Sequence, residues 1–253
     1  MNLATKNLLK ISSGLSFGIA ASLTFTSGEA HANCLTTFGS NPDSISDACY
    51  ITPDTYKVTI YEMGLCTDDP LEGTYASGDD VVTDSTISET SCIKTFESAA
   101  GGLQVDLASS TPVTLTGTHT RPANGTYEHA YIKIKNVFGV AGSYELASTT
   151  YCSSSGGDAD STTGCTATEF DDNLYDFEGG SSCSSPAVLA GSETFTTGVT
   201  GTMKALLATP DESGTYVGDT SCGSSTRIFG SFEPSSPIVI SGSTSGLDVQ
   251  FTV

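Results

Sequence analysis

The residues with the clearest chemistry in this sequence are its eight cysteines. An even number of cysteines in an exported chain is typical of disulfides. A zinc site is the alternative, but the sequence holds no C-x-x-C pair and only two histidines after residue 32, so disulfides are favoured. We expect each cysteine to pair with the next one, which closes four polar loops: Cys34–Cys49, Cys66–Cys92, Cys152–Cys165 and Cys183–Cys222.

Acidic loops are the second group of residues that could do chemistry. Ca²⁺ takes about six to eight oxygen ligands, and the stretch EFDDNLYDFEGG offers Asp171, Asn173 and Asp176. The spacing departs from D-x-[DN]-x-[DN]-G, because Tyr175 stands at the third ligand position. A solvated acidic loop is therefore favoured over a calcium site, and we expect no cofactor.

Catalytic motifs are missing from the sequence. It contains no H-E-x-x-H, G-x-S-x-G, Walker loop or dinucleotide fingerprint. Ser91 to Lys94 matches S-x-x-K, but the partner elements S-D-N and K-T-G are absent and Cys92 is expected to be bonded. His119 and His129 are too few for most acid–base arrangements. A carboxylate pair stays open as a hydrolase site, but we expect the protein not to be an enzyme.

The first 32 residues have the features of a signal peptide. Lys6 and Lys10 precede an apolar stretch without charge, and Ala30-His31-Ala32 fits the A-x-A cleavage rule. The apolar stretch is short for an uncleaved membrane anchor. A lipid anchor on Cys34 would need a small residue where Asn33 stands. We therefore expect residues 1–32 to be cleaved and residues 33–253 to be secreted to the cell exterior or surface.

Charge limits the partners of the chain. The net charge is −20, and residues 33–253 hold seven Lys and Arg against 28 Asp and Glu. Binding to nucleic acid or to anionic membranes depends on basic side chains that neutralise phosphate, so neither is expected. Asn124-Gly125-Thr126 matches a glycosylation sequon, although it is interpreted first as a turn.

Short alternating segments dominate the rest of the chain. In TYKVTIYEMGL, Tyr56, Val58 and Ile60 share one face of a strand. Ten or eleven such strands are expected, TPVTLTG (residues 111–117) among them, and KALLAT (residues 204–209) could form a helical turn. The pattern predicts an all-β fold: one antiparallel Ig-like or jelly-roll-like β-sandwich over residues 33–253, stapled by disulfides, with a Gly/Ser/Asp-rich excursion at about 153–185.

The segment SGLDVQFTV is the candidate for contact with another molecule. Its apolar residues alternate with polar ones, and Gly246 could act as a hinge; an extended segment of this kind adds readily to a sheet edge. As the candidate assembly strand we assign Leu247, Val249, Phe251 and Val253. The alternative is that this strand is the last one of its own sheet.

With its leader, disulfides, expected sandwich and closing strand after a glycine, the chain resembles secreted fimbrial subunits of the strand-complementing kind, including chaperone–usher pilins. The resemblance implies a subunit of an extracellular filament or surface assembly, a homopolymer joined by β-strand addition. Such pilins donate a segment ahead of the first cysteine, whereas Cys34 would be the second residue here. Leu35 to Asp47, or the C-terminal strand, would then make the connection. The alternative is a monomeric secreted module that binds glycans or surface proteins through loops such as Tyr144 to Tyr151.

Overall fold

The protein is described by a computed structural model that covers residues 10–14, 53–74, 83–109, 112–146, 149–157, 159–160, 165–175, 188–194, 200–210, 216–218 and 225–252. Over these residues the chain forms 20 strands and no helix, and every strand pair is antiparallel. The prediction of an antiparallel all-β chain is confirmed. The described part holds no helix long and apolar enough to cross a membrane.

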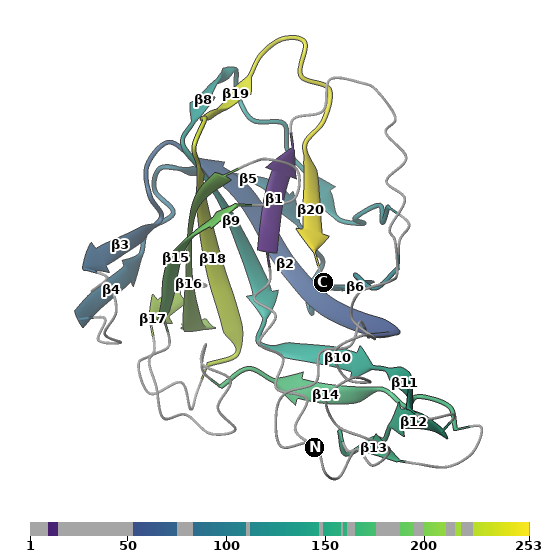
Figure 1. Cartoon of the computed structure of the whole chain (residues 1–253). Coiled ribbons are helices and arrows are strands. Elements are labelled where there is room, and N and C mark those ends of the chain that lie inside the picture. Colours follow the sequence, from purple (N-terminus) through teal and green to yellow (C-terminus); the bar gives the residue numbers. More distant parts are fainter. Residues whose placement is uncertain are drawn as a thin grey trace.

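Most strands belong to one large sheet (Figure 1). Its hydrogen-bonded path runs β14-β10-β2-β9-β18-β16-β17-β4-β3, and four further strands pair beside this path. The members are β2 (Thr55–Cys66), β3 (Leu71–Thr74), β4 (Thr83–Ile87), β5 (Cys92–Glu97), β6 (Leu103–Asp106), β7 (Thr118–His119), β9 (His129–Lys135), β10 (Val137–Ala141), β14 (Phe170–Asn173), β15 (Val188–Thr194), β16 (Thr200–Pro210), β17 (Tyr216–Gly218) and β18 (Arg227–Pro234).

Three small sheets accompany the large one. Strand β1 (Lys10–Gly14) pairs with β20 (Asp248–Thr252), and β8 (Gly125–Tyr127) pairs with β19 (Ile238–Ile240). The third sheet is formed by β11 (Ser143–Leu146), β12 (Thr149–Ser153) and β13 (Ala159–Asp160). In Figure 1, β1 and β20 lie in front of the large sheet, and the third sheet lies at its lower end near β10 and β14.

Strand β2 organises the large sheet because both of its edges are paired along nearly its whole length. One edge pairs with β10 and β9, and the other pairs with β6 and β5. Gly64 of β2 lies opposite Tyr131 of β9, whose ring crosses it: a Cβ at Gly64 would be 2.1 Å from Tyr131 Cε1. The position therefore requires glycine for the close approach of the ring.

Apolar side chains are buried on both faces of the large sheet, and their alternation along each strand assigns them to one face or the other. On β9, β16 and β18 the residues Ile134, Leu207 and Ile228 belong to one apolar cluster. Their neighbours on the opposite face belong to a second cluster, which also includes residues of β3 and β4: Tyr131, Leu206, Phe229, Leu71 and Ile87. Alternation fixes which face each side chain takes, and here Leu71 of β3 and Ile87 of β4 pack against the residues of the second face.

Two expectations about individual segments are wrong. KALLAT lies inside β16 and not in a helical turn, because β18 pairs with one edge of this segment, and β15 followed by β17 pairs with the other. Residues 112–117 of TPVTLTG form no strand; only Thr118 and His119, just after it, pair with β5. Pro112 removes a backbone donor, and Gly117 lies tightly against the Glu97 carbonyl oxygen, 2.4 Å from where a Cβ would stand.

Two of the expected disulfides are present. Cys66 is bonded to Cys92, joining β2 to β5, and Cys152 is bonded to Cys165. The pairs Cys34–Cys49 and Cys183–Cys222 lie outside the described residues. The second bond closes a loop in the first part of the predicted excursion, and β14, later in the same excursion, pairs with β10 at the edge of the large sheet.

Candidate functional site: the β20 edge and the charge cluster behind it

The candidate assembly strand coincides with β20 and the residue before it. Strand β20 does not join the large sheet; it lies across one face of it. Val249 is half-buried against the first apolar cluster, and Leu247 is half-buried against a third cluster that contains Leu65 and Ile240. Phe251 lies in β20, and Val253 lies outside the described residues. The strand is thus attached to its own core through side chains and not through the backbone ladder of the large sheet.

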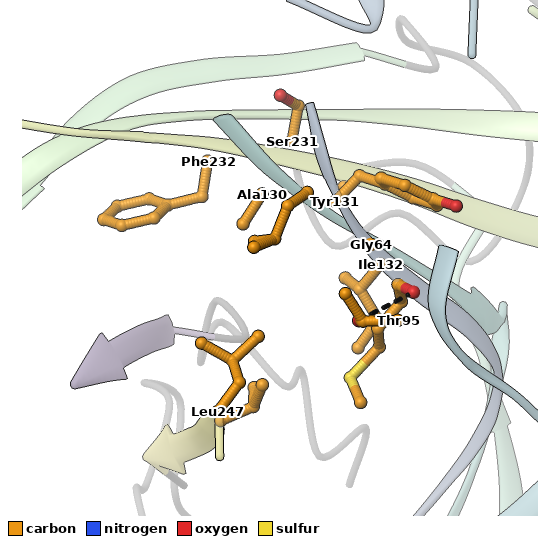
Figure 2. A pocket seen from close by; sticks show the side chains of 12 residues that line it. Gly64, Thr95, Ala130, Tyr131, Ile132, Ser231, Phe232 and Leu247 are labelled. Atoms are coloured by element: carbon orange, nitrogen blue, oxygen red, sulfur yellow. Dashed lines mark hydrogen bonds between the residues drawn. The ribbon is translucent and has the colours of Figure 1, made fainter. Parts of the chain in front are cut away.

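A small cavity separates this segment from the sheet (Figure 2). Its volume is about 30 Å³, roughly one or two water-sized spheres. The wall facing Leu247 and Val249 includes Met63, Leu65, Ile132 and Phe232. Because protein interiors normally leave few such voids, the packing of β20 on the sheet is incomplete at this point.

The backbone of β20 has one strand neighbour in the described part of the chain, which is β1. The antiparallel register places Lys10 opposite Thr252, Ser12 opposite Gln250 and Gly14 opposite Asp248. Strand β1 lies inside the predicted leader. The one strand that covers the β20 edge is therefore a strand that signal-peptide cleavage would remove.

On the second face of the sheet, next to the Tyr131 ring, acidic and basic side chains lie together in a cluster. The Lys133 side chain is only 4% exposed; its Nζ lies 3.2 Å from Glu62 Oε1 and also contacts Glu89. Glu62, 10% exposed, further accepts a hydrogen bond from the Tyr131 hydroxyl and lies 2.9 Å from Lys94 Nζ. The stacked rings of Tyr131 and Phe229, with centroids 5.4 Å apart, flank the Lys133 ammonium. We call these residues, Glu62, Glu89, Lys94, Tyr131 and Lys133, the charge cluster.

The cluster shifts the protonation of its members. Burial alone would raise the pKa of Glu62, but the hydrogen bonds from Tyr131 and Lys94 and the charge of Lys133 outweigh burial and hold this pKa below its ordinary value. Burial, followed by the hydrogen bond to Glu62, raises the pKa of the Tyr131 phenol. Glu62 is therefore an anion at neutral pH and Tyr131 a neutral donor to it. This arrangement holds an ion pair in place between β2 and β9.

The sequence interpretation did not single out the charge cluster. Lys133 stands in the alternating run YIKIK, where a lysine normally marks the solvent face of a strand. The available signal was Glu62, an acid in β2 that could face a lysine on a neighbouring strand. Glu62 and Lys133 lie directly opposite each other in the register of β2 and β9. The sequence does not indicate that these two strands pair, so it gives no reason to connect the two residues.

The other candidate residues remain scattered. Asp171 and Asn173 lie at exposed positions of β14, and Asp176 lies outside the described residues. In the described part no three His, Cys, Asp or Glu side chains gather in a way that could hold a metal ion. His119 is exposed and contacts the Leu115 carbonyl oxygen at 2.9 Å, whereas His129 is buried on β9.

The S-x-x-K match does not form a nucleophile with its base. Lys94 forms ion pairs with Glu62 and Glu97, both at 2.9 Å. The Ser91 hydroxyl contacts the Asp68 carbonyl oxygen at 3.3 Å, and Cys92 between them is disulfide-bonded. The serine and the lysine therefore have separate partners.

The aromatic residues proposed for ligand contact stack on each other. Tyr144 of β11 lies opposite Tyr151 of β12, and their ring centroids are 5.3 Å apart. Each residue is only 6% exposed, so neither ring presents a face on which a sugar could stack.

Comparison with known proteins gives no relative for this arrangement: no family model matches the chain, and neither a curated protein nor a solved structure is similar to it.

Proposed function

We propose that the protein is the structural subunit of an extracellular filament or surface assembly whose copies join by β-strand addition. The observation that supports the joining of copies through a strand is the position of β20. It is held on its core by Leu247 and Val249, and in the described part its backbone is covered only by β1, inside the predicted leader. An uncovered strand edge offers backbone donors and acceptors to another chain.

Further features support an extracellular structural role. The two disulfides indicate an oxidising compartment, in line with secretion after removal of residues 1–32. The strongly negative charge disfavours nucleic acid and anionic membranes as partners. The proposed subunit is an Ig-like or jelly-roll-like sandwich without enzymatic activity, cofactor or need of calcium, a likeness to strand-complementing pilins at the level of architecture.

A monomeric module that binds glycans or surface proteins is the alternative function. Its expected contact surface was the segment from Tyr144 to Tyr151, and the mutual burial of these two rings removes the aromatic platform on which it depended. No other described feature favours this alternative, so assembly is the function we propose.

Negative-stain electron microscopy of native material from the culture supernatant and the cell surface tests the proposal. Regular fibres or sheets that contain this chain are the expected result. Compact single particles only, at concentrations where a polymer should persist, would overturn it.

A further inference from the structure

Removal of the leader changes the β20 edge more than any other part of the described structure. Strand β1 pairs with all five residues of β20, from Asp248 to Thr252. Cleavage after Ala32 would take β1 away and leave β20 without a strand neighbour among the described residues, while Leu247 and Val249 still attach it to the core. Every other described strand keeps a partner. In the described part, each processed copy thus has one strand, β20, without any strand neighbour.

We infer that in the processed protein β20 pairs antiparallel with β20 of a second copy, at the edge that β1 covers in the full chain. This inference rests on the proposed function and names the strand that makes one of its contacts. The occupant is argued from two facts. The edge accepts an antiparallel strand of five residues, as β1 shows, and a second copy of β20 is such a strand with the same unpaired groups. One contact then pairs the uncovered backbone groups of β20 in both copies.

The register follows from length and charge. Pairing all five residues of both strands places the two-fold axis at Gln250, with Val249 opposite Phe251 and Asp248 opposite Thr252. Pairs of aromatic and β-branched residues stabilise antiparallel sheets, and like charges directly opposite each other destabilise them. A parallel arrangement would place Asp248 opposite Asp248. Residues 33–253 hold 28 acidic and only seven basic side chains. A contact in which the one acid of each strand faces a threonine is therefore a place where two copies can approach.

The symmetry of this contact has a consequence for the assembly. A two-fold contact uses the same surface on both copies and closes on itself, so it yields a dimer and not an open chain. In the proposed assembly β20 therefore supplies the dimer contact, and growth uses another surface. Before cleavage β1 occupies this same edge, so the precursor cannot offer it to a second copy.

The test begins from the full chain, expressed with its leader in an exporting host and recovered after processing, with the new N-terminus determined by sequencing. Gln250→Cys places a cysteine on the two-fold axis, where mild oxidation links two copies directly. Val239→Cys is the matched control, because Val239 is 50% exposed on β19 and outside the contact. We expect at least tenfold more linked dimer with Gln250→Cys, and a dimeric mass by light scattering for the unmodified processed protein.

A second pair of variants keeps the test independent of cysteine chemistry. Gln250→Pro removes a backbone donor from β20 and should give monomers with an unchanged far-ultraviolet circular dichroism spectrum. Ala30→Asp with Ala32→Asp blocks cleavage, retains β1 and should also give monomers. Dimers of this uncleaved chain, a mature N-terminus ahead of residue 15, or equal cross-linking at positions 250 and 239 would each overturn the inference.

The outcomes separate this inference from the proposed function. Fibres that form from Gln250→Pro protein as readily as from unmodified protein would overturn the β20 contact and leave strand addition elsewhere as the mode of assembly. Processed protein that is monomeric at about 100 µM and forms no fibres would overturn both.

Discussion

Replacing Lys133 with methionine is the most direct test of how the sheet is held together. Methionine retains most of the length of the lysine side chain and removes its charge. The side chain is 4% exposed and its ammonium contacts Glu62 and Glu89. The substitution therefore leaves two carboxylates without their shared cation, and it also removes the contacts of the ammonium with the Tyr131 and Phe229 rings, whose centroids are each 5.7 Å from Nζ.

The magnitude follows from what each carboxylate keeps. Removing one partner of a buried ion pair costs about 3–5 kcal/mol. Glu62 keeps Lys94 and the Tyr131 hydroxyl, and Glu89, with 32% of its side chain exposed, can be rehydrated. The cost should therefore lie near the lower limit, at about 3 kcal/mol. With a urea m-value near 3 kcal/mol/M, the unfolding midpoint falls by about 1 M.

Urea unfolding at pH 7, followed by circular dichroism, measures this loss. Lys94→Met is the control, because Lys94 contacts the same carboxylate from a position that is 39% exposed, where a pair contributes about 1 kcal/mol or less. In a Glu62→Gln background Lys133→Met should cost less than in the unmodified chain, since the two residues are coupled. Equal losses for Lys133→Met and Lys94→Met, or no coupling with Glu62, would refute the assignment of a buried ion pair.

Three further changes test other parts of the structure. Glu62→Gln should lower the unfolding free energy by about 2 kcal/mol at neutral pH. Because the folded state lowers the pKa of Glu62 from 4.5, the stability that Glu62 adds over Gln is full above about pH 4.5 and is lost as the pH falls through the lowered pKa of the folded state. Unfolding free energies of both proteins from pH 7 to 2 measure this, and a difference between them that stays constant with pH would contradict it. Gly64→Ala places a Cβ 2.1 Å from the Tyr131 ring and should cost about 2–3 kcal/mol, measured by thermal unfolding; an unchanged melting temperature would show that the ring can move aside. Replacing both Cys66 and Cys92 with alanine opens a loop of 26 residues and should lower the unfolding free energy by about 3.5 kcal/mol. Urea unfolding should show this loss without reductant and a much smaller one with reductant, which breaks the same bond in the unmodified chain; a loss of equal size under both conditions would contradict the assignment to the disulfide.

The sequence predicted local structure well where alternation alone decides it. Tyr56, Val58 and Ile60 lie on one buried face of β2, as their spacing indicated. The chemistry of the neighbouring cysteines led to the Cys66–Cys92 and Cys152–Cys165 bonds. These are short-range patterns, in which each residue is interpreted from its near neighbours.

Long-range pairing could not be predicted in this way. Lys133 is buried because residues of β3 and β4 pack against the second face of the sheet and because Glu62 faces it across a strand pair, and both facts depend on distant segments. KALLAT has no period that separates strand from helix; pairing with β15 and β18 decides it. For β20 the alternation indicated a strand but not its neighbour, which comes from the opposite end of the chain.

The position of β9 between β2 and β18 has a consequence for the order of folding. Ile134 lies opposite Ile60 on one side and Ile228 on the other, so the centre of the sheet joins three segments that are far apart in the chain. Sheets dominated by such non-local contacts form slowly, because long loops must close before any pairing is rewarded. We therefore expect the core to form only after β18 has been synthesised. A chain that stays unfolded until then remains able to thread through an export channel.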